Sequence, residues 1–224
     1  MVVDLLQGKE SNGRDRPQEP DAGDVWLWVA VDADTKLVPS WRLGQRDLAT
    51  AKDFVNDLAS RLSKRVQITS DGHRPYDGHR PYLEAIEGAF GSEVDYSQLH
   101  KIYGATSVED FRRYSPARCI GCEMKPVSGN SDPKHVSTSF VERQNWTVRT
   151  TMRRYTRLSN GFSRKLENHA AATALNYFAY NFIKIHRTLR MSPAMAVGVT
   201  DRLWDVADLV ALWEAYERRA ERAA

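Results

Sequence analysis

The order of apolar runs between residues 24 and 96 constrains the fold of this chain more than any other feature. Residues 24–32 (DVWLWVAVD) and 36–43 are β-branched and aromatic runs separated by a three-residue turn, which predicts an antiparallel hairpin. Periodicity and turn residues then predict, in order, a helix over 48–62, a strand over 65–70, a helix over 81–90 and a strand over 94–96. This alternation predicts a mixed α/β sheet flanked by helices.

The rest of the chain is predicted to be an irregular segment followed by helices. Residues 101–134 have little periodicity and are predicted to form an insertion or long loop. Helices are expected over 137–157, 163–187 and 201–222. The last of these is amphipathic and can pack on the core or on a second protomer, as in a homodimer. We predict that it packs on the core.

Length and composition limit the class of protein. The 224 residues, 42% of them hydrophobic, are enough to bury a core in one large or two small domains. No apolar run approaches the ~20 residues that span a bilayer, and the first residues lack the apolar segment of a signal peptide. We therefore expect a cytoplasmic protein without a membrane partner.

One carboxylate lies in a strongly basic helical segment. Glu142 is followed by Arg143, Arg149, Arg153, Arg154 and Arg157, and no further acid occurs before Glu167. Arginines neutralise phosphates and a carboxylate can ligate a divalent cation, so the segment suits a polyanion bound beside a metal ion. The alternative is a solvated basic helix face on which Glu142 is an ordinary ion-pair partner.

Cys119 and Cys122 form a single CxxC pair. A structural zinc site needs about four ligands, and only His100 and His135 lie near enough in the sequence to complete one. We predict that both cysteines are reduced residues of a loop or of the core.

Asp71 follows the predicted strand over 65–70 and precedes a glycine. A strand end fixes the position of a carboxylate, and a glycine lets a ligand approach, although Asp-Gly is also a common turn. The hexapeptide DGHRPY at 71–76 is repeated at 77–82, so Asp77 is an alternative to Asp71. We favour Asp71, because it keeps its position relative to the strand, whereas Asp77 keeps its position relative to the following helix. The end of a strand is the more rigid of the two. Combined with Glu142, it would give a site for a pair of Mg²⁺ ions that promotes phosphoryl transfer.

Seven segments in order resemble bacterial insertion-sequence transposases of the DDE type. They are DVWLWVAVDADTK, GQRDLATAKDFVNDLASRL, VQITSDGHRPY, DYSQLHKIYG, STSFVERQNWTVR, RRYTRLSNGFSRKLENH and YNFIKIHRTLRMSPAMAVGV, which together cover most of residues 24–199. The resemblance implies an RNase H-like catalytic core in which two Asp and one Glu bind divalent metal and perform DNA cleavage and strand transfer. It implies Asp71 as the second Asp and Glu142 as the Glu, with Mg²⁺ or Mn²⁺ as cofactor.

The resemblance also implies the division of the chain and its partner. Residues 1–23 would be the remnant of the first strand and a loop, 24–160 the catalytic core with an insertion at about 101–134, and 161–224 a C-terminal helical region packed on the core. The partner would be DNA at element ends and targets in the nucleoid, with no small-molecule substrate. The expected DNA-binding residues are Arg143, Asn145, Trp146, Arg149, Arg153, Arg154, Arg157 and Lys165. Asn145 could instead orient Glu142, and Trp146 could be a core residue.

Two departures from the family pattern concern the acid triad. The first Asp of the family lies in an opening strand, and Asp4 in VVDLL is the candidate here. An alignment through QGKESN would instead place that position before Met1. The interval from Asp71 to Glu142 is 142 − 71 = 71 positions, wider than in the most compact family members.

Three functions follow from these observations. The first is a metal-dependent DNA transposase domain of a mobile element, acting in recombination. The second is an inactive remnant that binds DNA without sequence specificity. The third is an RNase H-like nuclease that cleaves without joining strands.

Overall fold

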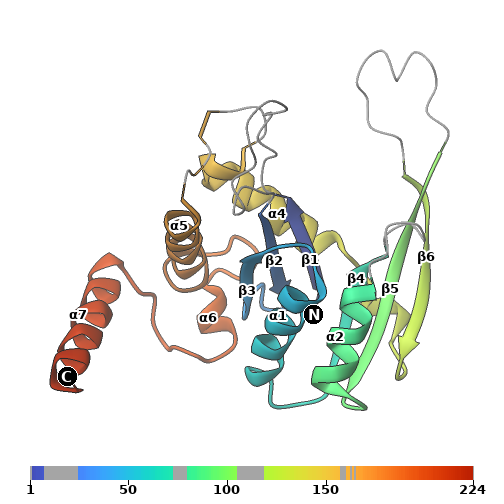
Figure 1. Cartoon of the computed structure of the whole chain (residues 1–224), viewed down its shortest axis with the longest axis horizontal. Coiled ribbons are helices and arrows are strands. Elements are labelled where there is room, and N and C mark those ends of the chain that lie inside the picture. Colours follow the sequence, from blue (N-terminus) through green and yellow to red (C-terminus); the bar gives the residue numbers. More distant parts are fainter. Residues whose placement is uncertain are drawn as a thin grey trace.

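The computed structural model describes residues 2–7, 25–72, 80–104, 119–156, 160–161, 163 and 165–223, and of residues 2–7, 80, 81 and 223 it describes the backbone alone. The strands in this part of the chain form one mixed sheet (Figure 1). They are β1 (Val2–Gln7), β2 (Trp26–Val31), β3 (Trp41–Gly44), β4 (Val66–Asp71), β5 (Val94–Tyr103) and β6 (Cys119–Ser128), in the spatial order β3-β2-β1-β4-β5-β6.

Strand β1 lies in the interior of the sheet and joins its two halves. It pairs antiparallel with β2 on one side and parallel with β4 on the other. Strands β4 and β5 are also parallel, and β6 runs antiparallel to β5 as an edge strand. The predicted mixed sheet with flanking helices is thereby confirmed, and its strand order is compatible with an RNase H-like fold.

Helices cover both faces of the sheet (Figure 1). α1 (Leu48–Ser60) and α2 (Arg80–Phe90) lie on one face, and α4 (Ser139–Thr151) lies on the other. The side chain of Asp47 caps α1 by accepting a hydrogen bond of 2.8 Å from the backbone N–H of Thr50. The remaining helical elements are η1 (Pro133–His135), η2 (Arg153–Tyr155), α5 (Leu166–Phe178), the π-helix η3 (Ala179–Ile183), α6 (Pro193–Ala196) and α7 (Val206–Ala223).

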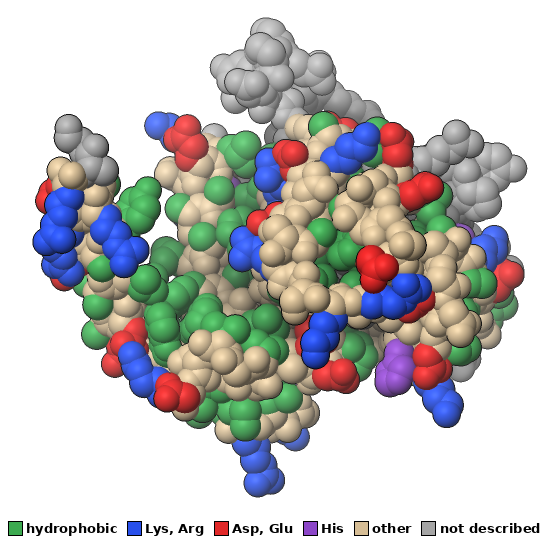
Figure 2. Space-filling view, turned by 90° about the horizontal axis from the view of Figure 1, so that it is seen from below, with side chains coloured by type: hydrophobic (Ala, Val, Ile, Leu, Met, Phe, Trp, Pro, Cys, Tyr) green, Lys and Arg blue, Asp and Glu red, His purple; other side chains and the backbone are tan. Residues whose placement is uncertain are grey.

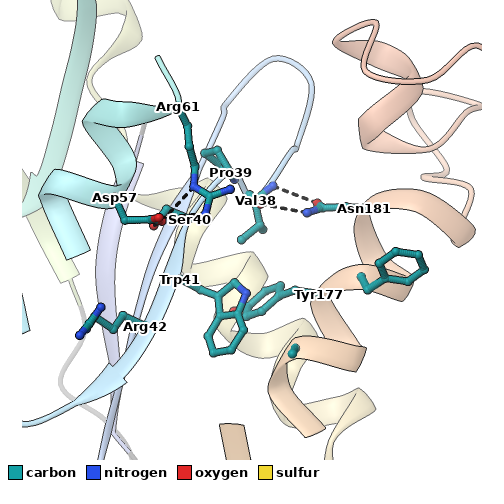
Figure 3. A pocket seen from close by; sticks show the side chains of 11 residues that line it. Val38, Pro39, Ser40, Trp41, Arg42, Asp57, Arg61, Tyr177 and Asn181 are labelled. Atoms are coloured by element: carbon teal, nitrogen blue, oxygen red, sulfur yellow. Dashed lines mark hydrogen bonds and ion pairs between the residues drawn. The ribbon is translucent and has the colours of Figure 1, made fainter. Parts of the chain in front are cut away.

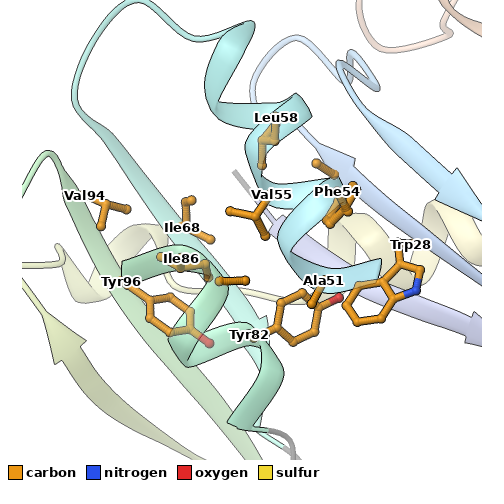
Figure 4. Packing of buried hydrophobic residues seen from close by; sticks show 12 residues of the cluster. Trp28, Ala51, Phe54, Val55, Leu58, Ile68, Tyr82, Ile86, Val94 and Tyr96 are labelled. Atoms are coloured by element: carbon orange, nitrogen blue, oxygen red, sulfur yellow. The ribbon is translucent and has the colours of Figure 1, made fainter. Parts of the chain in front are cut away.

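The core consists of two clusters, one on each face. Because side chains alternate along a strand, Trp28 points toward α1 and α2 while its neighbour Leu27 points toward α4. Figure 4 shows the first cluster, in which Ile68 and Tyr96 of the sheet meet Phe54 of α1 and other residues of both helices. The second cluster includes Leu27, Val29, Val31, Val141, Val148, Tyr155, Tyr177 and Tyr180.

Several element boundaries differ from the sequence-based expectation. Residues 101–134 are not one long loop, because they contain the end of β5 and the whole of β6. The helix expected over 137–157 ends at Thr151, where Met152 becomes extended and η2 turns Tyr155 into the second cluster. The helix expected over 163–187 ends at Phe178 and continues as the π-helix to Ile183. None of the described helices is long and apolar enough to span a membrane.

Candidate acid site and nucleic-acid interface

Asp71 is the last residue of β4, at the end of the sheet where β5 continues beyond it. Its backbone lies opposite Leu99 in the parallel register, and the N–H of Gly72 donates a hydrogen bond of 2.8 Å to the Leu99 carbonyl. The ring of His100 fills the space above Gly72, since a Cβ built there would lie 2.5 Å from the His100 Nε2. Any larger residue at this position would force the His100 ring to shift.

Lys101 brings Asp71 and Glu142 together. Its Nζ lies 3.5 Å from the Asp71 Oδ2 and also forms an ion pair with the Glu142 Oε1. Thr138, which precedes α4, donates a second hydrogen bond of 2.8 Å to the same oxygen of Glu142. Two acids that are far apart in the sequence thus converge on one ammonium group between β4, β5 and α4.

The Lys101 ammonium is firmly charged. Its burial alone would lower its pKa, but the hydrogen bond to Glu142 and the charges of Asp71 and Glu142 outweigh burial and raise the pKa to about 12. A positive charge is therefore held between the two carboxylates at any physiological pH.

The register of β1 places Asp4 beside this pair. Val3 lies opposite Ser70 in the parallel ladder, so continuing that register by one residue sets the backbone of Asp4 next to that of Asp71. The side chain of Asp4 lies outside the described part of the chain, as do Asp77 and Arg157 entirely.

The donor set fits a hard divalent cation in part. Asp71 and Glu142 supply carboxylate oxygens, which Mg²⁺ and Mn²⁺ prefer, and Lys101 shows that a cation is stabilised between them. Among side chains that the structure describes, no cluster of three or more His, Cys, Asp or Glu could hold a metal ion. The backbone of Asp4 lies next to that of Asp71 in the continued register, which makes its carboxylate a candidate for a third ligand.

Trp146 and Arg143 form an exposed platform one turn from Glu142. Trp146 is 53% exposed, so it is not a residue of the core. The guanidinium of Arg143 lies over its ring, with the Arg143 Cζ 4.4 Å from the ring centroid. An exposed indole held by a cation offers both a stacking surface for a base and a positive charge for phosphate.

The other expected DNA-binding residues differ from one another in how exposed their side chains are. Asn145 is buried, with 7% of its surface exposed, so it does not lie on this outer face. Arg154 donates a hydrogen bond of 2.6 Å to the Ser163 hydroxyl, which in turn contacts the buried His169 at 2.8 Å. Arg153 and Lys165 are exposed, and Arg149 is half-buried.

Cys119 and Cys122 lie on the edge strand β6 as exposed free thiols. They are residues of neither a loop nor the core, so that part of the expectation was wrong. Cys122 lies directly opposite Lys101 in the antiparallel register, which puts it at the rim of the acid site.

A cavity of about 380 Å³ lies at the other edge of the sheet, between β3 and α5 (Figure 3). Its polar groups are engaged with one another. Arg61 pairs with Asp57 at 2.8 Å, and the side-chain amide of Asn181 accepts from the Val38 N–H at 3.0 Å and donates to the Val38 carbonyl at 2.9 Å. Trp41 stacks on Tyr177 with ring centroids 5.8 Å apart. The residues that line this cavity connect the β2–β3 hairpin to α5, and none of them belongs to the acid site.

Comparison with known proteins identifies a shared fold. No protein-family model and no curated protein matches the sequence. The structure is similar to a chain of the simian T-cell lymphotropic virus intasome in complex with PP2A regulatory subunit B56 gamma, with a TM-score of 0.53 and 15% sequence identity. The alignment covers 91% of this chain and 55% of that chain, so this chain spans about half of its length. At this identity the likeness shows the fold alone.

Proposed function

We propose that this chain is the catalytic core of a DDE-type transposase, which cleaves DNA at the ends of a mobile element and joins the freed end to a target. The observation that carries the proposal is the convergence of Asp71 and Glu142 on Lys101, because it brings the two acids expected of the family to one place. Two further observations support it: the backbone register of Asp4, and the fold shared with a chain of a viral intasome structure.

The residues divide the work of phosphoryl transfer among them. Asp71, Glu142 and Asp4 would hold Mg²⁺ or Mn²⁺, which when bound would activate the attacking water or 3′-hydroxyl and stabilise the leaving oxygen. Thr138 fixes the orientation of Glu142 through its hydrogen bond. Lys101 neutralises the two acids and would have to move aside from at least one of them for a metal to be held there. DNA would lie along the Arg143 and Trp146 platform, beside Glu142.

A supercoiled-plasmid nicking assay with Mg²⁺ or Mn²⁺ tests the proposal. The parent protein should nick, and Asp71→Asn, Glu142→Gln and Asp4→Asn should each reduce the rate by at least ~10³-fold while DNA binding survives. Asp53→Asn is the matched control, because Asp53 forms an exposed pair with Arg42 at the far edge of the sheet. Asp77→Asn tests which copy of the repeated hexapeptide occupies the site. If Asp77→Asn loses activity and Asp71→Asn keeps it, Asp77 is the acid of the site in place of Asp71.

The products separate the alternatives. Joined products together with nicks support a transposase, whereas nicks without joining identify an RNase H-like nuclease. No cleavage, combined with DNA binding that weakens steeply with salt, identifies an inactive DNA-binding remnant.

A further inference from the structure

Strand β6 contains an irregularity close to the acid site. Tyr103 of β5 lies opposite Cys119, and the residue before it, Ile102, lies opposite Gly121. The ladder therefore skips Ile120, which is the extra residue of a β-bulge. Such a bulge sets two residues of one strand against a single residue of the other and changes which side chains share a face.

The bulge brings the two cysteines of β6 to one face of the sheet. Side chains alternate along a regular strand, so residues three positions apart normally point to opposite faces. Here the extra residue aligns Cys119 with Tyr103 and Cys122 with Lys101. Tyr103 and Lys101 are two positions apart on β5 and share a face. Both thiols therefore lie on the face from which Lys101 reaches the two acids.

The two thiols also contact one another. Partial desolvation and a hydrogen bond with Cys119 raise the pKa of the Cys122 thiol, and the charge of Lys101 acts in the opposite direction. The interaction with Lys101 agrees with the face that the register assigns to Cys122. Two thiols that share a hydrogen bond need to approach each other only a little farther to form an S–S bond.

The thiol pair is open to solvent. Cys119 and Cys122 are both exposed and free, and they are the two cysteines of the sequence, so no third thiol competes for either. Figure 2 shows the β5–β6 edge at the right of the molecule, where Lys and Arg side chains lie beside Asp and Glu side chains at the surface. A small polar reagent can therefore approach the pair from water.

We propose that Cys119 and Cys122 are a site of reversible modification, at which a small-molecule disulfide oxidises the two thiols to an intramolecular disulfide. The bulge, the contact between the thiols and their exposure carry this assignment. Exposed disulfides are reduced more readily than buried structural ones, so the bond opens again when small thiols are in excess. The modification does not depend on the reaction proposed for the acid site.

The exchange takes place in two steps. The thiolate of one cysteine attacks a sulfur of the small-molecule disulfide, whose S–S bond breaks, so that a mixed disulfide forms and one small thiol leaves. The second cysteine loses its proton and attacks the protein sulfur of the mixed disulfide. A bond forms between the Sγ atoms of Cys119 and Cys122, and the second small thiol leaves. The protein gives up two electrons and two protons, and the small-molecule disulfide takes them up.

Intact-mass spectrometry of the full chain tests the proposal. The reduced protein is incubated with oxidised glutathione and then treated with a thiol-alkylating reagent. The product should lack two hydrogen atoms, carry neither glutathione nor alkyl groups, and migrate as a single chain on a non-reducing gel. Dithiothreitol should restore the reduced mass. Cys119→Ser and Cys122→Ser should each retain one glutathione per chain, because the thiol that completes the exchange is missing.

The matched control moves one thiol to the other face. Cys119→Ser combined with Gly121→Cys gives two cysteines that are adjacent in sequence but point to opposite faces. The new side chain fits, since a Cβ at Gly121 would lie 3.8 Å from the Ile102 Cδ1. Its equilibrium constant for ring closure with glutathione should be at least ~100-fold smaller than that of the parent. A parent that retains glutathione, or that forms disulfides between chains, would overturn the proposal, as would a control that closes as readily as the parent.

Discussion

At the scale of single residues, Lys101 dominates the acid site. Its ammonium touches both Asp71 and Glu142, and without it two carboxylates would face each other across the end of β4. Its pKa of about 12 lies above the ordinary value of 10.5, so its contribution to stability is complete below that value and is lost as the pH rises through about 12. The contact is therefore insensitive to pH near neutrality.

Replacing Lys101 by Ala should make the protein more responsive to metal. Without Mn²⁺, the melting temperature should fall by a few degrees, because the pair with Glu142 is partly exposed and contributes about 1 kcal/mol. The rise in melting temperature on adding Mn²⁺ should be larger than in the parent, since no ammonium competes for the carboxylates. Lys52→Ala removes an exposed pair with Glu84 and serves as the control. A Mn²⁺ response equal to that of the parent would contradict competition by Lys101.

Replacing Trp146 by Ala should weaken binding to single-stranded DNA by about 10-fold or more, because stacking on an aromatic ring contributes about 1–3 kcal/mol per base. Fluorescence anisotropy of a labelled oligonucleotide would measure the affinity. Trp146→Phe keeps an aromatic face and should restore most of it. Equal affinities for the Ala and Phe variants would show that stacking on an aromatic ring at position 146 does not contribute to DNA binding.

The sequence singled out Asp71 and Glu142 as candidate acids but not the lysine between them. The two acids were candidates because each lies at a recognisable position, a strand end and a basic helix. Lys101 was missed because its role depends on the register of β4 against β5, which places Leu99 beside Asp71 and Lys101 two residues farther along the same face. That register is a tertiary property. The sequence DYSQLHKI carries no period-two signal for a strand that continues to Lys101, because its apolar residues, Tyr96, Leu99 and Ile102, recur every third position.

At the scale of elements, the β5–β6 pairing depends on a polar anchor at the end where β5 begins and β6 ends. Arg65 donates two hydrogen bonds to Asp95, at 2.7 and 3.0 Å, and the Asn130 N–H donates a third at 2.6 Å. Directly after β6, Gly129 has a φ of +68°, and a Cβ there would lie 2.1 Å from the Asp95 Oδ1. Asp95 therefore holds together the base of β4, the start of β5 and the end of β6.

Asp95→Asn should destabilise the protein in a pH-dependent way. The hydrogen bonds from Arg65 and from the Asn130 backbone lower the pKa of Asp95 from 3.8 to about 2. The ionised form is thus the one that stabilises the fold, fully above the ordinary pKa and progressively less as the pH falls through about 2. Melting temperatures of parent and variant should differ most at neutral pH and converge in acid. A difference that is constant with pH would show that charge is not its cause.

Strand β6 illustrates why a segment with little periodicity can still be regular. Its sequence, CIGCEMKPVS, has no clear alternation, and most of its residues are exposed. An edge strand with little buried surface is held by its ladder with β5, so its side chains carry no pattern that predicts it. The elements that bury a face, such as α1 and β4, were predicted to within a few residues.

At the scale of the whole molecule, a single sheet separates two cores. The first cluster involves α1 and α2, the second involves α4 and α5, and residues of β2 contribute to both. Because they share this sheet, the loss of either cluster should unfold the other. The chain should therefore behave as one cooperative unit between β2 and α5.

Leu58→Ala and Leu27→Ala test this cooperativity. Both leucines are fully buried, one in each cluster, and each substitution should cost about 2–5 kcal/mol. Calorimetry should show one transition in each variant, shifted down by roughly 5–20 °C. Two separated transitions in either variant would show that the clusters melt independently.

The distribution of the acid site over the chain has a consequence for synthesis on the ribosome. β1 and β4 are completed early, but Glu142 reaches Asp71 only after β5, β6 and the start of α4 have been made. A nascent chain that has emerged only as far as β6 carries Asp71 and Lys101 without Glu142. Any chemistry that requires both acids is therefore confined to polypeptides translated beyond α4, and premature termination before it yields a product without the pair.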